Sequence, residues 1–307
     1  MLDLRRIGAY ISRLRKDQDW TQLELADQLN VSHQAVSKWE RGDSLPDIGT
    51  LPQVARLFGR TVDDILNAGD HADSREHPHI GLIVEKFAEN RPGQVAELVN
   101  TGKLEMDELV EVAPFVKAST LQKVTEGIDS SVIKLEVIMR LAPFLGTGTL
   151  DELVHQAEKE EVTWSAITGL APFVSRATLS RLVDTSIDDF SEVDDLVGIA
   201  PFLEREHLDR LVQQTEGRSP SWQSIQELAP FISRGTLGSL VDRVADGTAD
   251  AHQIMSLAPF LDRVGLEKLL DGVEAEYLSP ELLASLAPFL DQGTLSRMVT
   301  SLLNKAK

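Results

Sequence analysis

Histidine, carboxylate and hydroxyl side chains are the groups in this chain that could catalyse a reaction or bind a metal ion. Three of the seven histidines, His71, His77 and His79, fall in one short polar segment. Their spacing matches no common pattern of metal ligands, so a solvated segment is the simpler interpretation. The chain has no cysteine, no glycine-rich phosphate loop, no His-Glu-x-x-His sequence and no catalytic serine, histidine and aspartate set placed on loops. We therefore expect no enzymatic activity, no metal ion and no cofactor.

Charge is distributed unevenly along the 307 residues, whose formal net charge is −19. Residues 1–66 carry nine Lys/Arg against ten Asp/Glu, and the remainder carries 21 against 39. An acidic surface repels nucleic acid and keeps a long chain in solution. No run of about 18 apolar residues is present, and the first residues lack the apolar stretch of a secretory signal. We therefore expect a soluble, cytoplasmic protein in which any contact with DNA comes from the first 66 residues.

Five short helices are expected in these first 66 residues. Ile7, Ile11 and Leu14 recur at i, i+4 and i+7, which predicts the first helix over about residues 4–16. The basic residues of this helix are expected mostly on the opposite, exposed side. They are Arg5, Arg6, Arg13, Arg15 and Lys16.

Capping residues predict where the other helices begin and end. Thr21-Gln22-Leu23-Glu24 has the pattern of a capping box and opens a short second helix. Asn30 follows where a tight turn needs a left-handed residue, which asparagine tolerates. Ser32 caps a third helix over His33–Arg41, and Gly42 ends it. The last two helices are expected over residues 47–58 and, capped by Thr61, over residues 61–66.

These caps, turn and core positions together resemble the lambda-repressor/Cro (Xre-type) helix-turn-helix over roughly residues 4–66. The matching residues are Thr21-Gln22-Leu23-Glu24-Leu25-Ala26, Val31-Ser32, Val36-Ser37-Lys38-Trp39-Glu40-Arg41-Gly42 and Leu45-Pro46. Two departures are small. Asn30 replaces the usual turn glycine, and Pro52 lies early in the fourth helix, where a missing N–H is tolerated. The resemblance implies a bacterial or phage transcriptional regulator.

The resemblance also implies how this domain would read DNA. The helix over residues 33–41 would enter the major groove, with its N-terminal half on base edges. Its outward face, away from Val36, then carries His33, Gln34, Ser37 and Lys38. Gln34 is suited to a bidentate bond with adenine, and Lys38 to guanine O6 and N7.

Other residues of the domain are suited to the DNA backbone. Gln22 and Ser32 stand at helix starts, where side chains and backbone N–H groups can hold phosphates. Arg13 or Lys16 would add further phosphate contacts. The alternative, a helix-turn-helix kept only for packing, is disfavoured because the outward residues are polar and long. Such domains usually act as dimers, so we expect a nucleoid-associated homodimer bound to double-stranded DNA, although no coiled-coil heptad specifies the dimer.

The rest of the chain is organised by a repeated tripeptide. Residues 67–79 are polar and read as a linker, and residues 80–100 resemble a degenerate capping repeat. Within residues 101–307 the sequence Ala-Pro-Phe occurs seven times, 29 residues apart. Its prolines are Pro114, Pro143, Pro172, Pro201, Pro230, Pro259 and Pro288. A fixed period of this length indicates a repeat architecture.

Apolar spacing within the 29-residue unit predicts two helices. Aliphatic residues five and two positions before each proline lie on one face of a first helix, and a leucine seven positions after it opens the core of a second. The proline is expected to bend or end the first helix, and the phenylalanine to fill the gap beneath. The start of the first helix is predicted at Ser219-Pro220 and Ser279-Pro280, and that of the second at Ser175, Ser233, Asp262 and Asp291.

These predictions add up to an all-α fold: a five-helix domain followed by an α-solenoid of seven two-helix repeats. The 34-residue tetratricopeptide pattern does not match, and the Ala-Pro-Phe repeats belong to no family that we can name. Four consecutive repeats place arginine four residues after the proline, at Arg176, Arg205, Arg234 and Arg263. A ladder that binds an acidic peptide is one interpretation, and pairing with neighbouring carboxylates is the favoured one.

Two functions remain open. In the favoured one, a regulator reads discrete operators while its acidic solenoid binds a protein or peptide partner or mediates oligomerisation. In the alternative, a scaffold self-associates through the solenoid and is merely tethered to DNA with weak sequence preference.

Overall fold

The computed structural model describes residues 2–70, 79–157, 162–186, 192–215, 219–244, 250–271 and 279–305, without the side chains of residues 271 and 301–305. Every regular element in these ranges is a helix, and the ranges contain no strand, which confirms the predicted all-α class. None of the helices described is long and apolar enough to cross a membrane. Contacts divide the chain into two compact units, Met1–Glu161 and Val162–Lys307.

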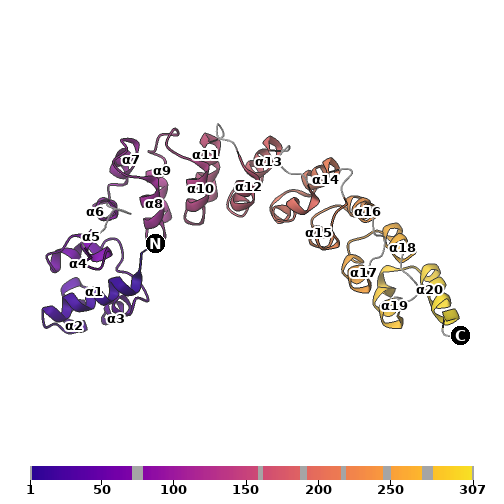
Figure 1. Ribbon diagram of the computed structural model, residues 1–307, viewed down its shortest axis with the longest axis horizontal. Coiled ribbons are helices and arrows are strands. Elements are labelled where there is room, and N and C mark those ends of the chain that lie inside the picture. Colours follow the sequence, from indigo (N-terminus) through magenta and orange to yellow (C-terminus); the bar gives the residue numbers. More distant parts are fainter. Residues whose placement is uncertain are drawn as a thin grey trace. The chain divides into compact units, whose positions relative to one another are not determined.

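The N-terminal region forms the five expected helices (Figure 1). They are α1 (Leu4–Asp17), α2 (Gln22–Leu29), α3 (His33–Arg41), α4 (Leu51–Leu57) and α5 (Val62–Leu66). The predicted bounds of α3 are confirmed, but the predicted start of α4 at residue 47 was wrong. The Asp47 carboxylate accepts the N–H groups of Gly49 and Thr50 at 2.9 Å, which holds a turn ahead of the helix. Pro52 then lies in the first turn of α4, where the backbone N–H that proline lacks would have no partner within the helix.

Side-chain caps define the ends of α2 and α3. Thr21 accepts the N–H of Glu24, whose carboxylate accepts the N–H of Thr21 at 2.7 Å, so the capping box is confirmed. Asn30 ends α2 in the left-handed conformation with φ of 52°. Ser32 caps α3 through the N–H of Ala35, and Gly42 ends it with φ of 74°. The two helices are therefore separated by a tight turn.

A close approach of α1 to α3 holds the domain together. A Cβ atom at Gly8 would lie 2.1 Å from the carbonyl oxygen of Trp39, so only glycine fits this crossing. Apolar side chains of α1, α2 and α3 meet around this contact. The buried ones are Ile7, Ile11, Leu14, Leu25, Ala26, Leu29, Val36 and Trp39.

The remaining helices follow in pairs. The first unit continues with α6 (Ile80–Ala88), α7 (Pro92–Asn100), α8 (Met106–Val112), η1 (Ala113–Phe115), α9 (Ala118–Thr125), α10 (Leu135–Leu141), η2 (Ala142–Phe144) and α11 (Thr147–Ala157). The second unit contains α12 (Trp164–Leu170), α13 (Arg176–Thr185), η3 (Val193–Leu196), η4 (Ala200–Phe202), α14 (Arg205–Gln214), α15 (Trp222–Leu228), α16 (Arg234–Asp242), α17 (Ala251–Leu257), α18 (Arg263–Asp271), α19 (Pro280–Leu286), η5 (Ala287–Phe289) and α20 (Gln292–Lys305). Residues 71–78 of the expected linker, with His71 and His77, lie outside the described residues.

Helix starts in both units keep the spacing of the tripeptide. The helices before Ala-Pro-Phe start at Met106, Leu135, Trp164, Val193, Trp222, Ala251 and Pro280, and those after it at Ala118, Thr147, Arg176, Arg205, Arg234, Arg263 and Gln292. Each start lies 29 residues after the one before it. Equivalent helices are also neighbours in space: α15 contacts α17, and α14 and α18 both contact α16. This arrangement is consistent with the expected solenoid.

Ala-Pro-Phe directly follows the end of the preceding helix at six of the seven copies, and at the fourth copy η3 already ends at Leu196. In the fifth copy α15 ends at Leu228, and the N–H of Phe231 bonds to the Leu228 carbonyl at 2.9 Å, a tighter turn than an α-helix. Proline has no N–H to continue the α-helical bonds. The expected filling of the gap by phenylalanine is only partly correct, because five of the seven rings are half-buried and the other two, Phe115 and Phe289, are 37% and 41% exposed.

Caps of the repeated helices follow the sequence with one exception. Ser175 and Ser233 cap α13 and α16, and the Asp262 and Asp291 carboxylates accept the N–H groups of Gly265 and Thr294. Ser279 caps α19, with Pro280 as its first residue. The predicted cap at Ser219-Pro220 was wrong. Ser221 caps α15 instead, because its hydroxyl accepts the N–H of Ser224 at 3.1 Å.

Candidate nucleic-acid interface

Helix α3 presents a polar face to solvent and an apolar face to its own domain. Val36 and Trp39 are buried where α3 contacts α1 and α2. The residues predicted to read bases lie on the opposite face: His33, Gln34 and Lys38 are exposed, and Ser37 is half-buried. Because α3 is anchored on its inner side and capped at both ends, these side chains share one rigid surface.

Ser37 differs from its neighbours because it already has a partner. Arg41, one turn further along α3, donates from Nη1 to the Ser37 hydroxyl at 2.5 Å. The same guanidinium donates from Nε to the Asp43 carboxylate at 2.8 Å. The Ser37 hydroxyl can still donate its own hydrogen, whereas His33, Gln34 and Lys38 reach furthest from the helix.

A polar cluster around Glu40 joins α3 to α1 and α2. Arg15 donates from Nε to Oε1 at 2.5 Å and from Nη2 to Oε2 at 2.9 Å. Ser12 of α1 and Gln22 of α2 each donate to Oε2 at 2.9 Å. Arg15 also donates from Nη1 to the carbonyl of Trp20, in the connection between α1 and α2. One carboxylate therefore fixes three helices relative to one another.

Hydrogen bonding determines the ionisation of this cluster. Burial by itself would raise the pKa of the Glu40 carboxyl, but the bonds from Arg15, Gln22 and Ser12 outweigh it and hold this pKa below its usual value. The bond to Glu40 in turn raises the pKa of the Arg15 guanidinium. Both groups are therefore charged at neutral pH.

The expected outward position of Arg15 was wrong, since its side chain is buried. The signal was present in the sequence. Arg15 follows Ile11 by four residues, which places it on the same stripe of α1 as Ile7 and Ile11. A charged residue on an apolar stripe predicts a buried partner, and Glu40 is that partner.

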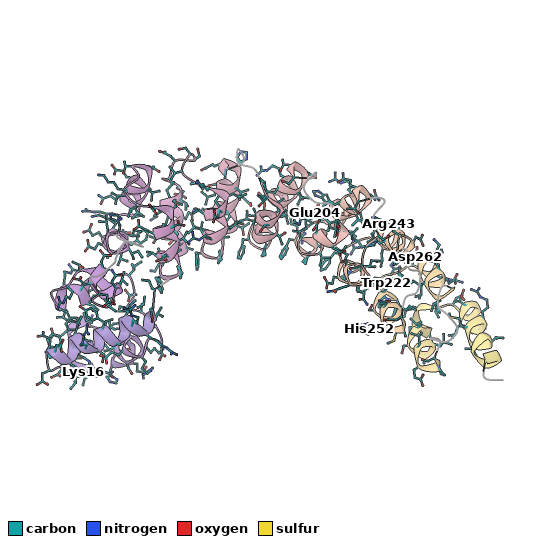
Figure 2. All side chains as sticks on the ribbon, viewed as in Figure 1. Lys16, Glu204, Trp222, Arg243, His252 and Asp262 are labelled. Atoms are coloured by element: carbon teal, nitrogen blue, oxygen red, sulfur yellow. The ribbon has the colours of Figure 1, made fainter. Side chains whose placement is uncertain are left out.

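The residues predicted to hold phosphates occupy three different places. Ser32 is exposed at the start of α3, with its hydroxyl oxygen accepting the Ala35 N–H. Gln22 is half-buried at the start of α2 and uses one amide hydrogen on Glu40, which leaves a second hydrogen for a phosphate. Arg13 and Lys16 are exposed on α1, and the Arg13 guanidinium lies 4.9 Å above the Tyr10 ring (Figure 2 labels Lys16). Gln22 and α3 are thus joined through Glu40, whereas no contact described here joins Arg13 or Lys16 to α3.

The domain is attached to the following helices through α5. The Asp63 carboxylate accepts the N–H of Gly81, in the first turn of α6, at 2.7 Å. Burial raises the pKa of the Asp63 carboxyl, although the Gly81 N–H opposes this. A Cβ atom at Gly81 would lie 2.5 Å from Asp63 Oδ2, so the contact requires a residue without a side chain. The first turn of α6 is therefore held by the N-terminal domain.

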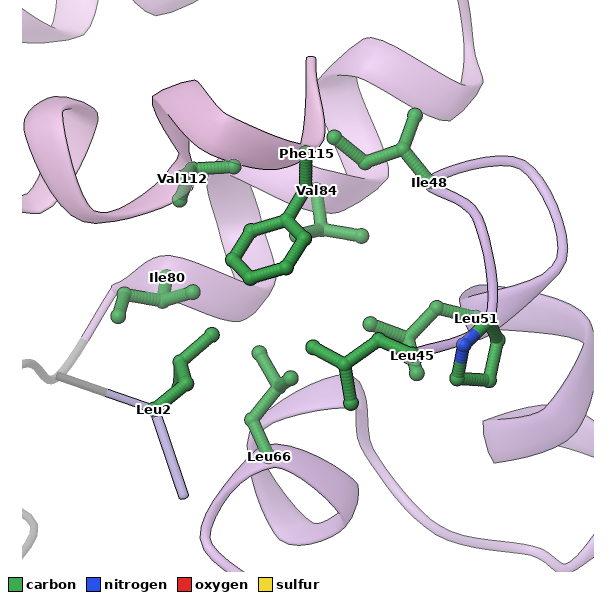
Figure 3. Close-up of a pocket in the computed structure, with 10 residues that line it drawn as sticks. Leu2, Leu45, Ile48, Leu51, Leu66, Ile80, Val84, Val112 and Phe115 are labelled. Carbon is green, nitrogen blue, oxygen red and sulfur yellow. The ribbon is translucent and has the colours of Figure 1, made fainter. Parts of the chain in front are cut away.

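Glu108 of α8 holds the same end of α6 from the other side. Its side chain is buried, and Oε1 accepts the N–H of His79 at 3.0 Å and lies 3.3 Å from His79 Nδ1. An apolar pocket lies beside the start of α6, and in it Leu2, Leu45 and Leu66 face Phe115 (Figure 3). The other lining residues are Pro46, Ile48, Leu51, Ile80, Val84 and Val112. The loop after α3 thus contacts helices of the expected repeats.

Comparison with known families identifies the N-terminal region. Residues 11–65 match the family model described as Helix-turn-helix. The match covers the second half of α1 and continues into α5, so this region is a helix-turn-helix domain of the lambda-repressor/Cro (Xre) type. The resemblance drawn from the sequence is confirmed for this region.

Two curated relatives are similar to the same region. HTH-type transcriptional activator BcrR of Enterococcus faecalis is 39% identical over 57 residues, which are 19% of this chain and 28% of that protein. The SPbeta prophage-derived uncharacterized HTH-type transcriptional regulator YonR of Bacillus subtilis (strain 168) is 31% identical over 65 residues, 21% of this chain and 59% of that protein. The chain therefore spans less than two thirds of either relative.

Proposed function

We propose that this protein is a sequence-specific DNA-binding transcriptional regulator that acts as a homodimer. The observation that carries the proposal is the outward face of α3, where His33, Gln34 and Lys38 project from a buried and doubly capped helix. Long polar side chains on such a helix can bond to base edges in the major groove. The regulators BcrR and YonR, similar over the same domain, support this assignment.

The assignment of residues follows from the same geometry. Gln34 would read adenine and Lys38 guanine, with His33 and Ser37 beside them. Ser32, Gln22, Arg13 and Lys16 would hold the phosphates. Residues 1–66 then form the DNA-binding domain, 67–79 the connection, 80–100 a capping repeat and 101–307 the solenoid.

The helical array would bind a protein or peptide partner or mediate oligomerisation. The contacts between α5 and α6 would couple this binding to the affinity for DNA. Asp63 and the apolar pocket connect α5 and the loop after α3 to α6 and α8. A partner that shifts these helices would alter the position of α3 and so the affinity for an operator. No enzymatic activity is part of this proposal.

Sequencing of fragmented genomic DNA retained by the protein tests it. The wild type should retain a few sharp palindromic sites, and Gln34→Ala/Lys38→Ala should lose them. Gln156→Ala/Lys123→Ala changes the same residue types at exposed positions on α11 and α9 and should leave the sites unchanged. Diffuse enrichment that is insensitive to Gln34 and Lys38 would contradict base reading and favour the tethered scaffold.

A further inference from the structure

An aromatic surface recurs at each Ala-Pro-Phe corner of the second unit. The alanine is buried at Ala171, Ala200, Ala229 and Ala258. The proline after each of them is exposed, and the phenylalanine is half-buried, with the last one, Phe289, 41% exposed. An exposed proline beside a partly exposed phenylalanine therefore recurs at every corner, and apolar surface that gathers in one place is typical of an interaction site.

The same corners carry a cation. Helices α13, α14, α16 and α18 begin with Arg176, Arg205, Arg234 and Arg263, all of them exposed. Arg263 pairs with Glu267 and Asp291. Over the described ranges of residues 162–307, the other three arginines make no ion pair. The favoured expectation of carboxylate pairing thus applies to only one of the four.

An arginine is unfavourable at these positions for the helix itself. The N-terminal end of a helix carries partial positive charge, which favours carboxylates and disfavours cations. Four consecutive repeats nevertheless carry arginine as the first helical residue. Three of these arginines have no ion pair in the described residues to offset this cost, and an uncompensated break of a local rule is expected where a surface serves a function.

We define the Pro-Phe-Arg strip as residues Pro172–Arg176, Pro201–Arg205, Pro230–Arg234 and Pro259–Arg263. Equivalent helices are neighbours in this unit, since α14 and α18 both contact α16, so successive corners follow one another (Figure 1). Glu204 and Asp262, labelled in Figure 2, mark two of the corners. The strip carries four arginines against these two carboxylates, whereas residues 162–307 as a whole carry 12 Lys/Arg against 21 Asp/Glu. The strip itself therefore carries net positive charge on an acidic unit, and the carboxylates that contact it include Asp209, which accepts the Ser233 N–H, and Glu267 and Asp291, which pair with Arg263.

We infer that the Pro-Phe-Arg strip binds an extended acidic segment of a partner protein. The carboxylates of this segment face Arg176, Arg205 and Arg234, and its apolar side chains pack on the exposed prolines and the accessible edges of the half-buried phenylalanines. The inference rests on the proposed function and names the partner class of the regulator's helical array. Exposed carboxylates more than about 8 Å from the strip act only weakly on the bound segment, because salt screens charges beyond that distance.

The length of the bound segment follows from the spacing of the Ala-Pro-Phe corners. Packed helices lie about 8–10 Å apart, so four corners span roughly 30 Å. An extended chain rises about 3.3 Å per residue, and about ten residues therefore cover the strip.

Selection from a library of random 12-residue peptides displayed on phage tests the inference, with the full-length protein as bait. Enriched peptides should carry net negative charge and apolar residues. A synthetic copy of one of them should bind at least tenfold more weakly to Arg176→Glu and to Arg234→Glu than to the wild type, as measured by fluorescence anisotropy. Arg210→Glu makes the same charge change on an exposed part of α14 outside the strip and should bind like the wild type. Glutamate suits a helix start, so lost binding in the strip variants would not reflect unfolding.

Three results would overturn the inference: no enrichment, enrichment of basic peptides, or equal binding to Arg234→Glu and Arg210→Glu. Self-association that sedimentation detects in the wild type but not in Arg234→Glu would likewise replace the acidic segment with a second copy of the chain. Genomic DNA retention by the same variants separates the two proposals. The strip variants should keep the operator sites, so a failure of peptide binding leaves DNA recognition standing.

Discussion

Arg15 of α1 and Glu40 of α3 form an almost fully buried bidentate ion pair, with Nε 2.5 Å from Oε1 and Nη2 2.9 Å from Oε2. The pair lies directly behind the helix that carries the candidate base-reading residues. Since Gln22 and Ser12 bond to the same carboxylate, the orientation of α3 depends on a polar cluster as well as on apolar packing. Changes in this cluster should therefore affect stability and DNA binding together.

Removing the carboxylate is expected to destabilise the domain strongly. Glu40→Ala leaves the Arg15 guanidinium buried without a partner, which typically costs about 3–5 kcal/mol. Denaturant unfolding followed by circular dichroism measures the change in the free energy of unfolding. The exposed pair of Arg41 and Asp43 is the matched control, because Arg41→Ala at the surface should cost at most about 1 kcal/mol. Equal losses in the free energy of unfolding would show that the buried pair stabilises the domain no more than the exposed pair does.

Acid should weaken the domain through the same carboxylate. The pKa of Glu40 is lower in the folded domain than its ordinary value of 4.5. A depressed pKa contributes stability that is present above the unfolded value and is lost as the pH falls through the folded value. Thermal unfolding between pH 7 and pH 3 should therefore show a decline below about pH 4.5 that is smaller in Glu40→Gln. Parallel curves for the two proteins would exclude Glu40 as the source.

A double-mutant cycle should detect the contact between Asp63 of α5 and Gly81 of α6. Alanine in place of a helical glycine normally stabilises by about 0.5–1 kcal/mol. Gly81→Ala should lose this gain in the wild type, because the new Cβ displaces the Asp63 carboxylate, and recover it in an Asp63→Ala background. Gly93 of α7 has no atom near the position of a new Cβ, so Gly93→Ala should stabilise in both backgrounds. Additive effects of Gly81→Ala and Asp63→Ala would contradict the contact.

Phosphate and base contacts should be separable by salt. Lys16→Ala would remove one of the proposed phosphate contacts, so it should weaken binding to all sequences and reduce the slope of log K against log salt by about 0.9. Gln34→Ala should leave that slope unchanged and relax discrimination at one base pair by about 1–3 kcal/mol. Anisotropy titrations on an operator and on its point variants, from 50 to 200 mM salt, measure both quantities. A changed salt slope for Gln34→Ala would assign that residue to the backbone.

Helical periodicity and capping patterns predicted most helix bounds of the N-terminal domain. They gave the wrong start for α4 and the wrong face for Arg15. The capping box at Thr21 and the bounds of α3 depend on residues no more than four apart, which a sequence displays directly. The start of α4 was misplaced because the Asp47 side chain competes with the helix for the same N–H groups. Arg15 was misplaced because residue type was weighed above its position on the apolar stripe.

The sequence by itself determined the all-helical class, the helix-turn-helix domain and the 29-residue spacing of helix starts. These features follow from helical periodicity, from capping side chains and from a proline that cannot donate a hydrogen bond. Only the tertiary structure decided that Glu40 bonds to residues of two other helices, that Asp63 holds α6 and that three of the strip's arginines have no carboxylate partner among the described residues. Such features depend on the distance between residues far apart in the chain, and no local pattern encodes that distance.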